Sequence, residues 1–139
     1  MRPPTPSQTV GPFFGFALPL VEGEGDARVE GQVLDGAGEP VSDALLEVWQ
    51  GDHFSRCRTD EEGAFHFALP EAVNFVNITV FARGLLRHLN TRMYAPGAAD
   101  EVLEEVDPAR RHTLVARQDG KVLRWEVRLQ GAEETVFFA

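Results

Sequence analysis

The chain has 139 residues and a formal net charge of −9 at pH 7, with 13 basic against 22 acidic side chains. That length can bury one hydrophobic core and is too short for two, so residues 1–139 are predicted to form one domain. Hydrophobic residues make up 43% and charged residues 25%, which is typical of a soluble globular protein. The acidic balance argues against nucleic-acid binding, because contacts to phosphates depend on basic patches.

The pattern of the sequence predicts neither a secretory signal nor a membrane-spanning segment. Its apolar stretches are a few residues long, and the first residues lack the apolar core of a signal peptide. A cytoplasmic location is therefore expected. Cys57 is the one cysteine, which excludes an intrachain disulfide, a CxxC pair and a Cys-rich zinc site. It is predicted to be a small, buried, apolar residue.

Residues 1–26 are predicted to be an extended N-terminal arm. Residues 1–21 hold five of the nine prolines and show no helical period. Phe13, Phe14 and Phe16 lie within four residues and need a surface to cover them. We therefore expect the arm to pack along another surface.

From residue 27 onward, apolar and polar residues alternate and turns follow at short intervals, as in an antiparallel β-sandwich. Strands are predicted over residues 28–34, 44–50, 64–69, 75–81, 113–116, 122–129 and 135–138, with turns at 35–40 and 59–63. The strand at 75–81 carries large apolar groups on both faces, so it is predicted to be central. Asp100 is predicted to cap a short helix over residues 101–106.

The usual catalytic motifs are missing. The sequence has no GxSxG, HExxH, P-loop or GxGxxG motif. Asp52 and His53 are adjacent and would face opposite ways on a strand, and His66 is expected to be a partly exposed structural histidine. In a metal enzyme built on the histidines, the fold would have to bring His53, His66 and His88 together from distant segments of the chain.

Three arginines form a better candidate site. Arg83, Arg87 and Arg92 lie within ten residues of one another. A guanidinium group offers a planar fork of donors that matches a carboxylate, whereas lysine offers a point charge. An ion pair with one of the many acidic residues is an equal alternative for Arg92 and the favoured one for Arg83 and Arg87.

Several stretches resemble a known family. Residues 29–50, with a strand, a Gly-x-Pro-Val-type turn and a second strand, resemble the intradiol ring-cleavage dioxygenases, whose fold is a transthyretin-like antiparallel β-sandwich. Residues 5–13, 80–94 and 128–138 are similar to the alpha subunits of protocatechuate 3,4-dioxygenases within that family. Relative to those subunits, the chain looks shortened between residues 52 and 59 and around residues 70–74.

The resemblance implies that this chain does not bind iron itself. The family's Fe(III) is held by two tyrosinates and two histidines, and this chain has one tyrosine, Tyr94. Phe75 and Asn77 stand where catalytic relatives carry a His-x-His pair. The resemblance therefore implies Fe(III) in an iron-bearing homologous beta subunit, with this chain as the non-catalytic partner in a hetero-oligomer.

The resemblance also implies a role for residues of this chain at the subunit interface. Thr9, Gly11 and Pro12 of the arm, together with Arg92, would line the substrate pocket of the beta subunit. The substrate would be the aromatic dihydroxy acid protocatechuate, cleaved to 3-carboxy-cis,cis-muconate. The alternative is a stand-alone transthyretin-like binding module, in which Trp49 and Trp125 would recognise a partner, although Trp125 alternates in phase with core residues.

Overall fold

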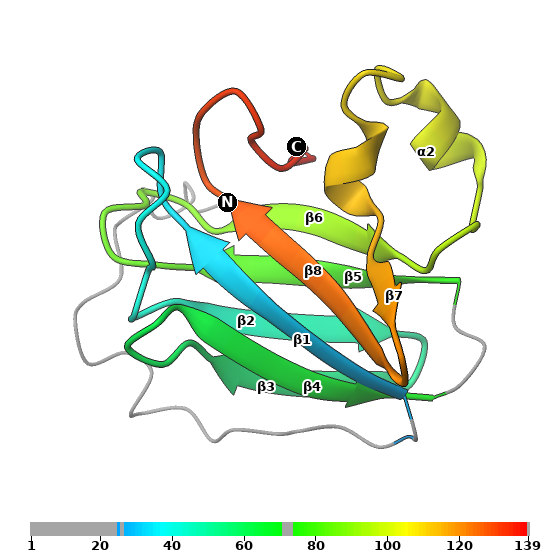
Figure 1. The fold of residues 1–139 in the computed structure, drawn as a ribbon, viewed down its shortest axis with the longest axis horizontal. Helices are drawn as coiled ribbons and strands as arrows, with labels where there is room; N and C mark the ends of the chain where they lie inside the picture. Colours follow the sequence, from blue (N-terminus) through cyan, green and yellow to red (C-terminus); the bar gives the residue numbers. More distant parts are fainter. Residues whose placement is uncertain (1–24, 26, 71–73, 139) are drawn as a thin grey trace, which may run out of the picture.

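The computed structural model describes residue 25, residues 27–70 and residues 74–138. Two four-stranded sheets pack face to face, and the short helices lie at one end of this sandwich (Figure 1). The predicted β-sandwich is therefore confirmed. The predicted arm lies outside the described residues except for Gly25, so its packing stays a prediction.

The two sheets have the strand orders β4-β1-β8-β7 and β3-β2-β5-β6. Neighbouring strands are antiparallel except for β1 and β8, which run parallel. The strand bounds are β1 Ala27–Leu34, β2 Leu45–Gln50, β3 His53–Arg58, β4 Ala64–Leu69, β5 Phe75–Phe81, β6 Leu89–Tyr94, β7 Arg117–Asp119 and β8 Val122–Arg128.

The hydrophobic core lies between the two sheets and follows the predicted alternation. On β5, Val76, Ile78 and Val80 face inward and are at most 1% exposed. β5 lies between β2 and β6, so the predicted central strand is confirmed. Trp125 of β8 is buried among the core residues, and its indole Nε1 donates to the backbone carbonyl of Thr113 at 3.0 Å.

Both predicted turns are present and are closed by aspartate side chains. The Asp60 Oδ1 accepts hydrogen bonds from the backbone amides of Glu62 and Ala64, and Asp35 does the same in the turn after β1. Gly63 has a φ of 73°, and a Cβ there would lie 2.7 Å from the carbonyl oxygen of Val33. Glycine is therefore required at this turn.

The helical segments agree only in part with the prediction. Helix α2 covers Glu101–Glu105 and is capped by Asp100, as predicted. The predicted strand at residues 113–116 is wrong, because a 3-10 helix, η1, occupies Arg111–Leu114 and Val115 forms one isolated bridge to Tyr94. Among the described residues, no helix is long and apolar enough to cross a membrane.

Four further segments differ from the sequence prediction. The predicted strand at residues 135–138 is wrong, since the segment forms a single bridge, from Phe138 to Asn90 of β6. Strands β3, β6 and β7 are not among the predicted strands. The inward side chains of β3 include Ser55 and Cys57, which are too small to give a hydrophobic alternation. β3 pairs with β2 as a hairpin, where the sequence suggested only a short loop.

Candidate functional site

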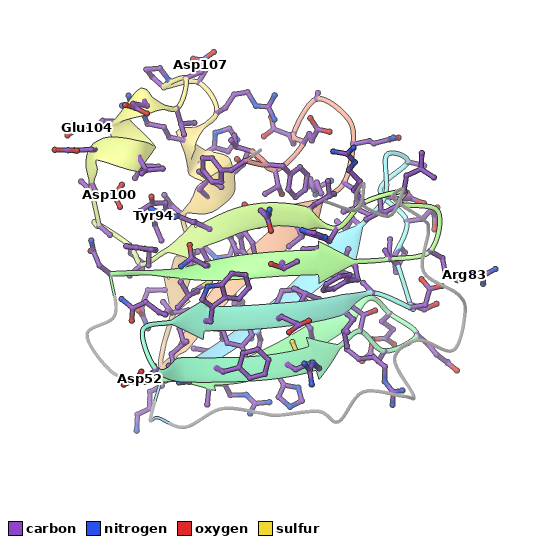
Figure 2. The ribbon with its side chains drawn as sticks, turned by 180° about the vertical axis from the view of Figure 1, so that it is seen from behind. Asp52, Arg83, Tyr94, Asp100, Glu104 and Asp107 are labelled. Atoms are coloured by element: carbon purple, nitrogen blue, oxygen red, sulfur yellow. The ribbon has the colours of Figure 1, made fainter. Side chains whose placement is uncertain are left out.

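The candidate site lies on the outer face of the β3-β2-β5-β6 sheet, which Figure 2 views. Strand register places Trp49 of β2 beside Asn77 of β5, and Asn77 beside Arg92 of β6. All three side chains leave the sheet on the same side, because their neighbours Val48, Ile78 and Met93 point into the core. The result is a row of an indole, an amide and a guanidinium across three strands.

Arg92 is held by four neighbours on this face. Its Nε donates to Asn77 Oδ1 at 3.2 Å, and its Nη1 donates to the Tyr94 hydroxyl at 3.3 Å. The same Nη1 lies 3.5 Å from Asp100 Oδ2, and the guanidinium carbon lies 4.2 Å from the centre of the Phe75 ring. The Arg92 side chain remains 24% exposed. Its planar head is therefore fixed in direction while still reaching solvent.

Tyr94 is buried beneath this arginine. Its hydroxyl donates to Asp100 Oδ1 at 2.9 Å, and its ring packs on Phe75 with centroids 5.6 Å apart. Burial raises the pKa of the Tyr94 hydroxyl, and the nearby Asp100 carboxylate adds to this increase, while the Arg92 guanidinium opposes it. Tyr94 is therefore a protonated phenol at neutral pH.

Asp100 connects the sheet to helix α2. The same Oδ1 that accepts from Tyr94 also accepts from the backbone amide of Leu103 at 2.9 Å, which makes Asp100 the helix N-cap. Figure 2 shows Tyr94 and Asp100 close together beneath α2. One carboxylate thus holds the helix, the phenol and the guanidinium in a single network.

A pocket of about 340 Å³ opens beside this network. Its walls include Trp49, Asn77 and Arg92 from the sheet, Val102 from α2, and Phe138 from the C-terminal segment. Trp49 is 39% exposed, one of two large hydrophobic residues with a high exposure among those described. The pocket therefore combines apolar walls with a cationic, hydrogen-bond-donating end.

The side chains at this site do not fit a ferric ion. Phe75 has no donor atom, the Asn77 oxygen already accepts from Arg92, and the Tyr94 hydroxyl is a protonated phenol bonded to Asp100. Within the described part of the chain, no three side chains of His, Cys, Asp or Glu form a group that could hold a metal ion. A guanidinium charge stands directly over the Phe75 ring.

The arginine cluster expected from the sequence does not form. Arg92 belongs to the site, but Arg83 is 61% exposed, pairs with Asp43 at 3.5 Å, and lies at the opposite end of the sheet (Figure 2). Arg87 is exposed in the loop before β6. Thr9, Gly11 and Pro12 lie outside the described residues.

The histidines likewise lie apart. His112 pairs with Glu133, the His88 ring contacts Phe81, and His66 is exposed on the other sheet, opposite Glu30 in the register. His53 begins β3, next to Asp52 in the β2–β3 turn. The structure therefore does not bring His53, His66 and His88 together.

A larger hollow of about 750 Å³ lies on the outer face of the β4-β1-β8-β7 sheet. Its charged side chains pair mainly with one another, in contacts such as Arg28 with Glu30 and Arg128 with Glu126. Arg124 likewise lies 2.7 Å from Asp119. Because these charges neutralise one another, the smaller pocket beside Arg92 is the stronger candidate for ligand binding.

Comparison with known proteins agrees with the architecture. The dioxygenase domain of a dioxygenase and carbohydrate-binding fusion protein from Streptomyces sp. SirexAA-E matches with a TM-score of 0.57 and 23% identity, over 78% of this chain and 82% of that chain. Such a likeness establishes the fold. The sandwich is thus that of the intradiol ring-cleavage dioxygenases.

Comparison of amino-acid sequences identifies a smaller group of relatives. The protocatechuate 3,4-dioxygenase alpha chain of Burkholderia cepacia is 35% identical over 190 aligned positions, covering 96% of both chains. The alpha chain of the same name from Pseudomonas putida is 34% identical, covering 99% of this chain and 97% of its own length. No family model matches the sequence. The chain belongs to the family of protocatechuate 3,4-dioxygenase alpha chains. Because the alignments are longer than this chain, it lacks segments that those relatives have.

Asp100 and Tyr94 form part of the site although the sequence does not single them out for it, and Trp49 is named only as a contact residue of the alternative binding module. The sequence predicts Asp100 only as a helix cap, and Tyr94 enters only as the single tyrosine of the chain, too few for the family's iron site. Their contacts with Arg92 depend on the pairing of β6 with β5 and on the position of α2. The cap at Asp100 was the one local signal that could have pointed to this network.

Proposed function

We propose that this chain is the non-catalytic alpha-type subunit of an Fe(III)-dependent protocatechuate 3,4-dioxygenase in the cytoplasm. An iron-bearing homologous beta subunit would carry out intradiol cleavage of protocatechuate to 3-carboxy-cis,cis-muconate. This chain would complete the wall of the beta subunit's substrate pocket and contribute no metal ligand. The names of its relatives, which are alpha chains, support a hetero-oligomer.

The Arg92 guanidinium carries the first part of this proposal. It lies over Phe75 and is bonded to Asn77. By the resemblance, these two residues would stand where catalytic relatives carry a His-x-His pair. A fixed positive charge at that place opposes binding of a trivalent cation. The neutral amide of Asn77 is also a weak ligand for ferric iron compared with imidazole or phenolate. These contacts support a chain that leaves iron chemistry to its partner.

The second part of the proposal concerns substrate binding at the subunit contact. Thr9, Gly11 and Pro12 of the arm and Arg92 of β6 would line the mouth of the beta subunit's pocket. Glycine allows a close backbone approach and proline has a fixed φ, which suits residues of a pocket wall. The Arg92 head is oriented by its neighbours and still partly exposed, so its Nη2 group would donate a charge-assisted hydrogen bond to the substrate carboxylate.

Replacing Arg92 by alanine tests this role. In the complex with the beta subunit, R92A is expected to raise KM for protocatechuate by about 10-fold to 100-fold, because a charged hydrogen bond contributes about 1.5–3 kcal/mol. Iron content should not change, since Arg92 would hold the substrate and not the metal. Steady-state kinetics and iron analysis of the purified complex give both quantities.

Arg83→Ala is the matched control, because Arg83 is an exposed arginine at the far end of the same sheet. Its KM should equal that of the unmodified complex. An unchanged KM in R92A would contradict the proposed contact with substrate. A loss of iron in R92A would also contradict it, since Arg92 would then be supporting the metal centre.

A further inference from the structure

We propose that the pocket beside Arg92 is itself a binding site for a small aromatic carboxylate, complete within this chain and independent of iron. The proposal shares Arg92 with the proposed function, but every wall named here belongs to this chain, so the site can be tested without a partner. The carboxylate would lie against Asn77 and Arg92, and the aromatic ring would lie against Trp49.

The polar end of the pocket offers hydrogen-bond donors. Asn77 Oδ1 accepts from Arg92 Nε, and because arginine cannot accept a hydrogen bond, this contact fixes which end of the amide faces it. The Asn77 Nδ2 group is left with no hydrogen-bond partner among the described residues. Arg92 uses Nε and Nη1 for its contacts, so its Nη2 group likewise has no hydrogen-bond partner among the described residues.

The position of Asp100 determines how strongly an anion would bind. Its carboxylate lies 3.5 Å from Nη1 and reduces the net positive charge of the site. Asn90 also lines the pocket, and its Oδ1 already accepts from the Thr79 hydroxyl at 3.1 Å. Donors therefore predominate at the pocket, but the charge is partly compensated. We expect modest affinity, with a dissociation constant on the order of 1 mM.

The remaining walls select for a ring. Trp49 presents an exposed indole, and Val102 and Phe138 add apolar surface. A volume of about 340 Å³ lies at the small end of the range for ligand pockets. A phosphate or sulfate ion would leave these apolar walls in contact with water. A benzoate-like ligand would cover them and would stack on the indole.

Binding of 4-fluorobenzoate to the iron-free chain, followed by fluorine NMR, tests the proposal. The unmodified chain should shift or broaden the fluorine resonance of 4-fluorobenzoate. It should leave the resonance of neutral 4-fluorobenzamide unchanged, because the benzamide has no charge for Arg92. Asn77→Asp is nearly isosteric and replaces the Nδ2 donor by an acceptor that repels a carboxylate. We expect N77D to weaken binding at least tenfold.

Asn74→Asp is the matched control, because it adds the same charge at an exposed residue that does not line the pocket. Trp49→Leu removes the stacking surface at an already exposed position, so it provides a second variant should N77D fail to fold. It should also weaken binding about tenfold. Equal binding of the benzamide, or unchanged affinity in both N77D and W49L, would overturn the proposal. An absence of binding at 4-fluorobenzoate concentrations well above 1 mM would also overturn the proposal.

The outcome can be separated from that of the proposed function. A chain that fails to bind 4-fluorobenzoate alone can still raise the activity of an iron-bearing partner. Conversely, the chain could bind the ligand but change neither the activity nor the KM of the partner. That result would support this binding site and contradict the proposed role as a subunit.

Discussion

The free energy of unfolding is expected to fall by about 4 kcal/mol between pH 9 and pH 12 because of Cys57 alone. Burial raises the pKa of the Cys57 thiol from its ordinary value of 9.0 to about 12. Each unit of pKa difference corresponds to about 1.4 kcal/mol. In this pH range the unfolded chain loses the thiol proton while the folded chain keeps it. The contribution is therefore complete below pH 9 and is lost as the pH rises to about 12.

Urea unfolding of the unmodified chain and of Cys57→Ala at several pH values from 8 to 12 would measure this effect. Groups such as Tyr94, whose pKa is also raised, titrate in both proteins and cancel in the comparison. C57A should begin less stable, because it leaves a small cavity, and should approach or exceed the unmodified chain at high pH. Parallel curves for the two proteins would show that the folded thiol titrates normally.

The Asp100→Ala substitution is expected to lower the free energy of unfolding by about 3 kcal/mol. It removes the N-cap of α2, which contributes about 1 kcal/mol. It also deprives the buried Tyr94 hydroxyl of its acceptor, which costs about 1–3 kcal/mol. The ion pair with Arg92 adds less than about 1 kcal/mol, because both side chains are about a quarter exposed.

Asp100→Asn distinguishes these contributions. The asparagine Oδ1 can still accept from Tyr94 and from the Leu103 amide, so D100N should lose only the ion pair and remain within about 1 kcal/mol of the unmodified chain. Adding Tyr94→Phe to D100A should recover part of the loss, because no hydroxyl is then left without a partner. Chemical unfolding of the four proteins measures these differences. Equal losses in D100A and D100N would contradict the role of the shared oxygen.

The strands with large inward side chains could be predicted from sequence alternation. Val29 and Val33 of β1, and Val76, Ile78 and Val80 of β5, are the kind of residues that define a period of two. β3 and β6 lack that signal, because Ser55 and Thr91 face inward at positions where the pattern needs an apolar residue. Their place in the sheet depends on pairing with β2 and β5, which local sequence does not encode.

The candidate site could be predicted only in part for a related reason. The sequence singled out Arg92, and the resemblance pointed to Phe75 and Asn77. The register of β5 with β6 brings these three together, and it separates Arg92 from Arg83. Asp100 reaches the site from α2, which follows β6 by a turn. Side chains from separate elements meet through tertiary packing, so their contacts were not visible in any single segment.

The most direct test is to purify the chain alone, and again after co-expression with a homologous chain that carries two tyrosines and a His-x-His pair. Iron content and cleavage of protocatechuate are then measured on both samples. The chain alone should contain no stoichiometric iron and show no ring cleavage, whereas the complex should be red-brown and active. Ring cleavage by the chain alone, or iron bound by its own side chains, would contradict the proposal that catalysis belongs to a partner.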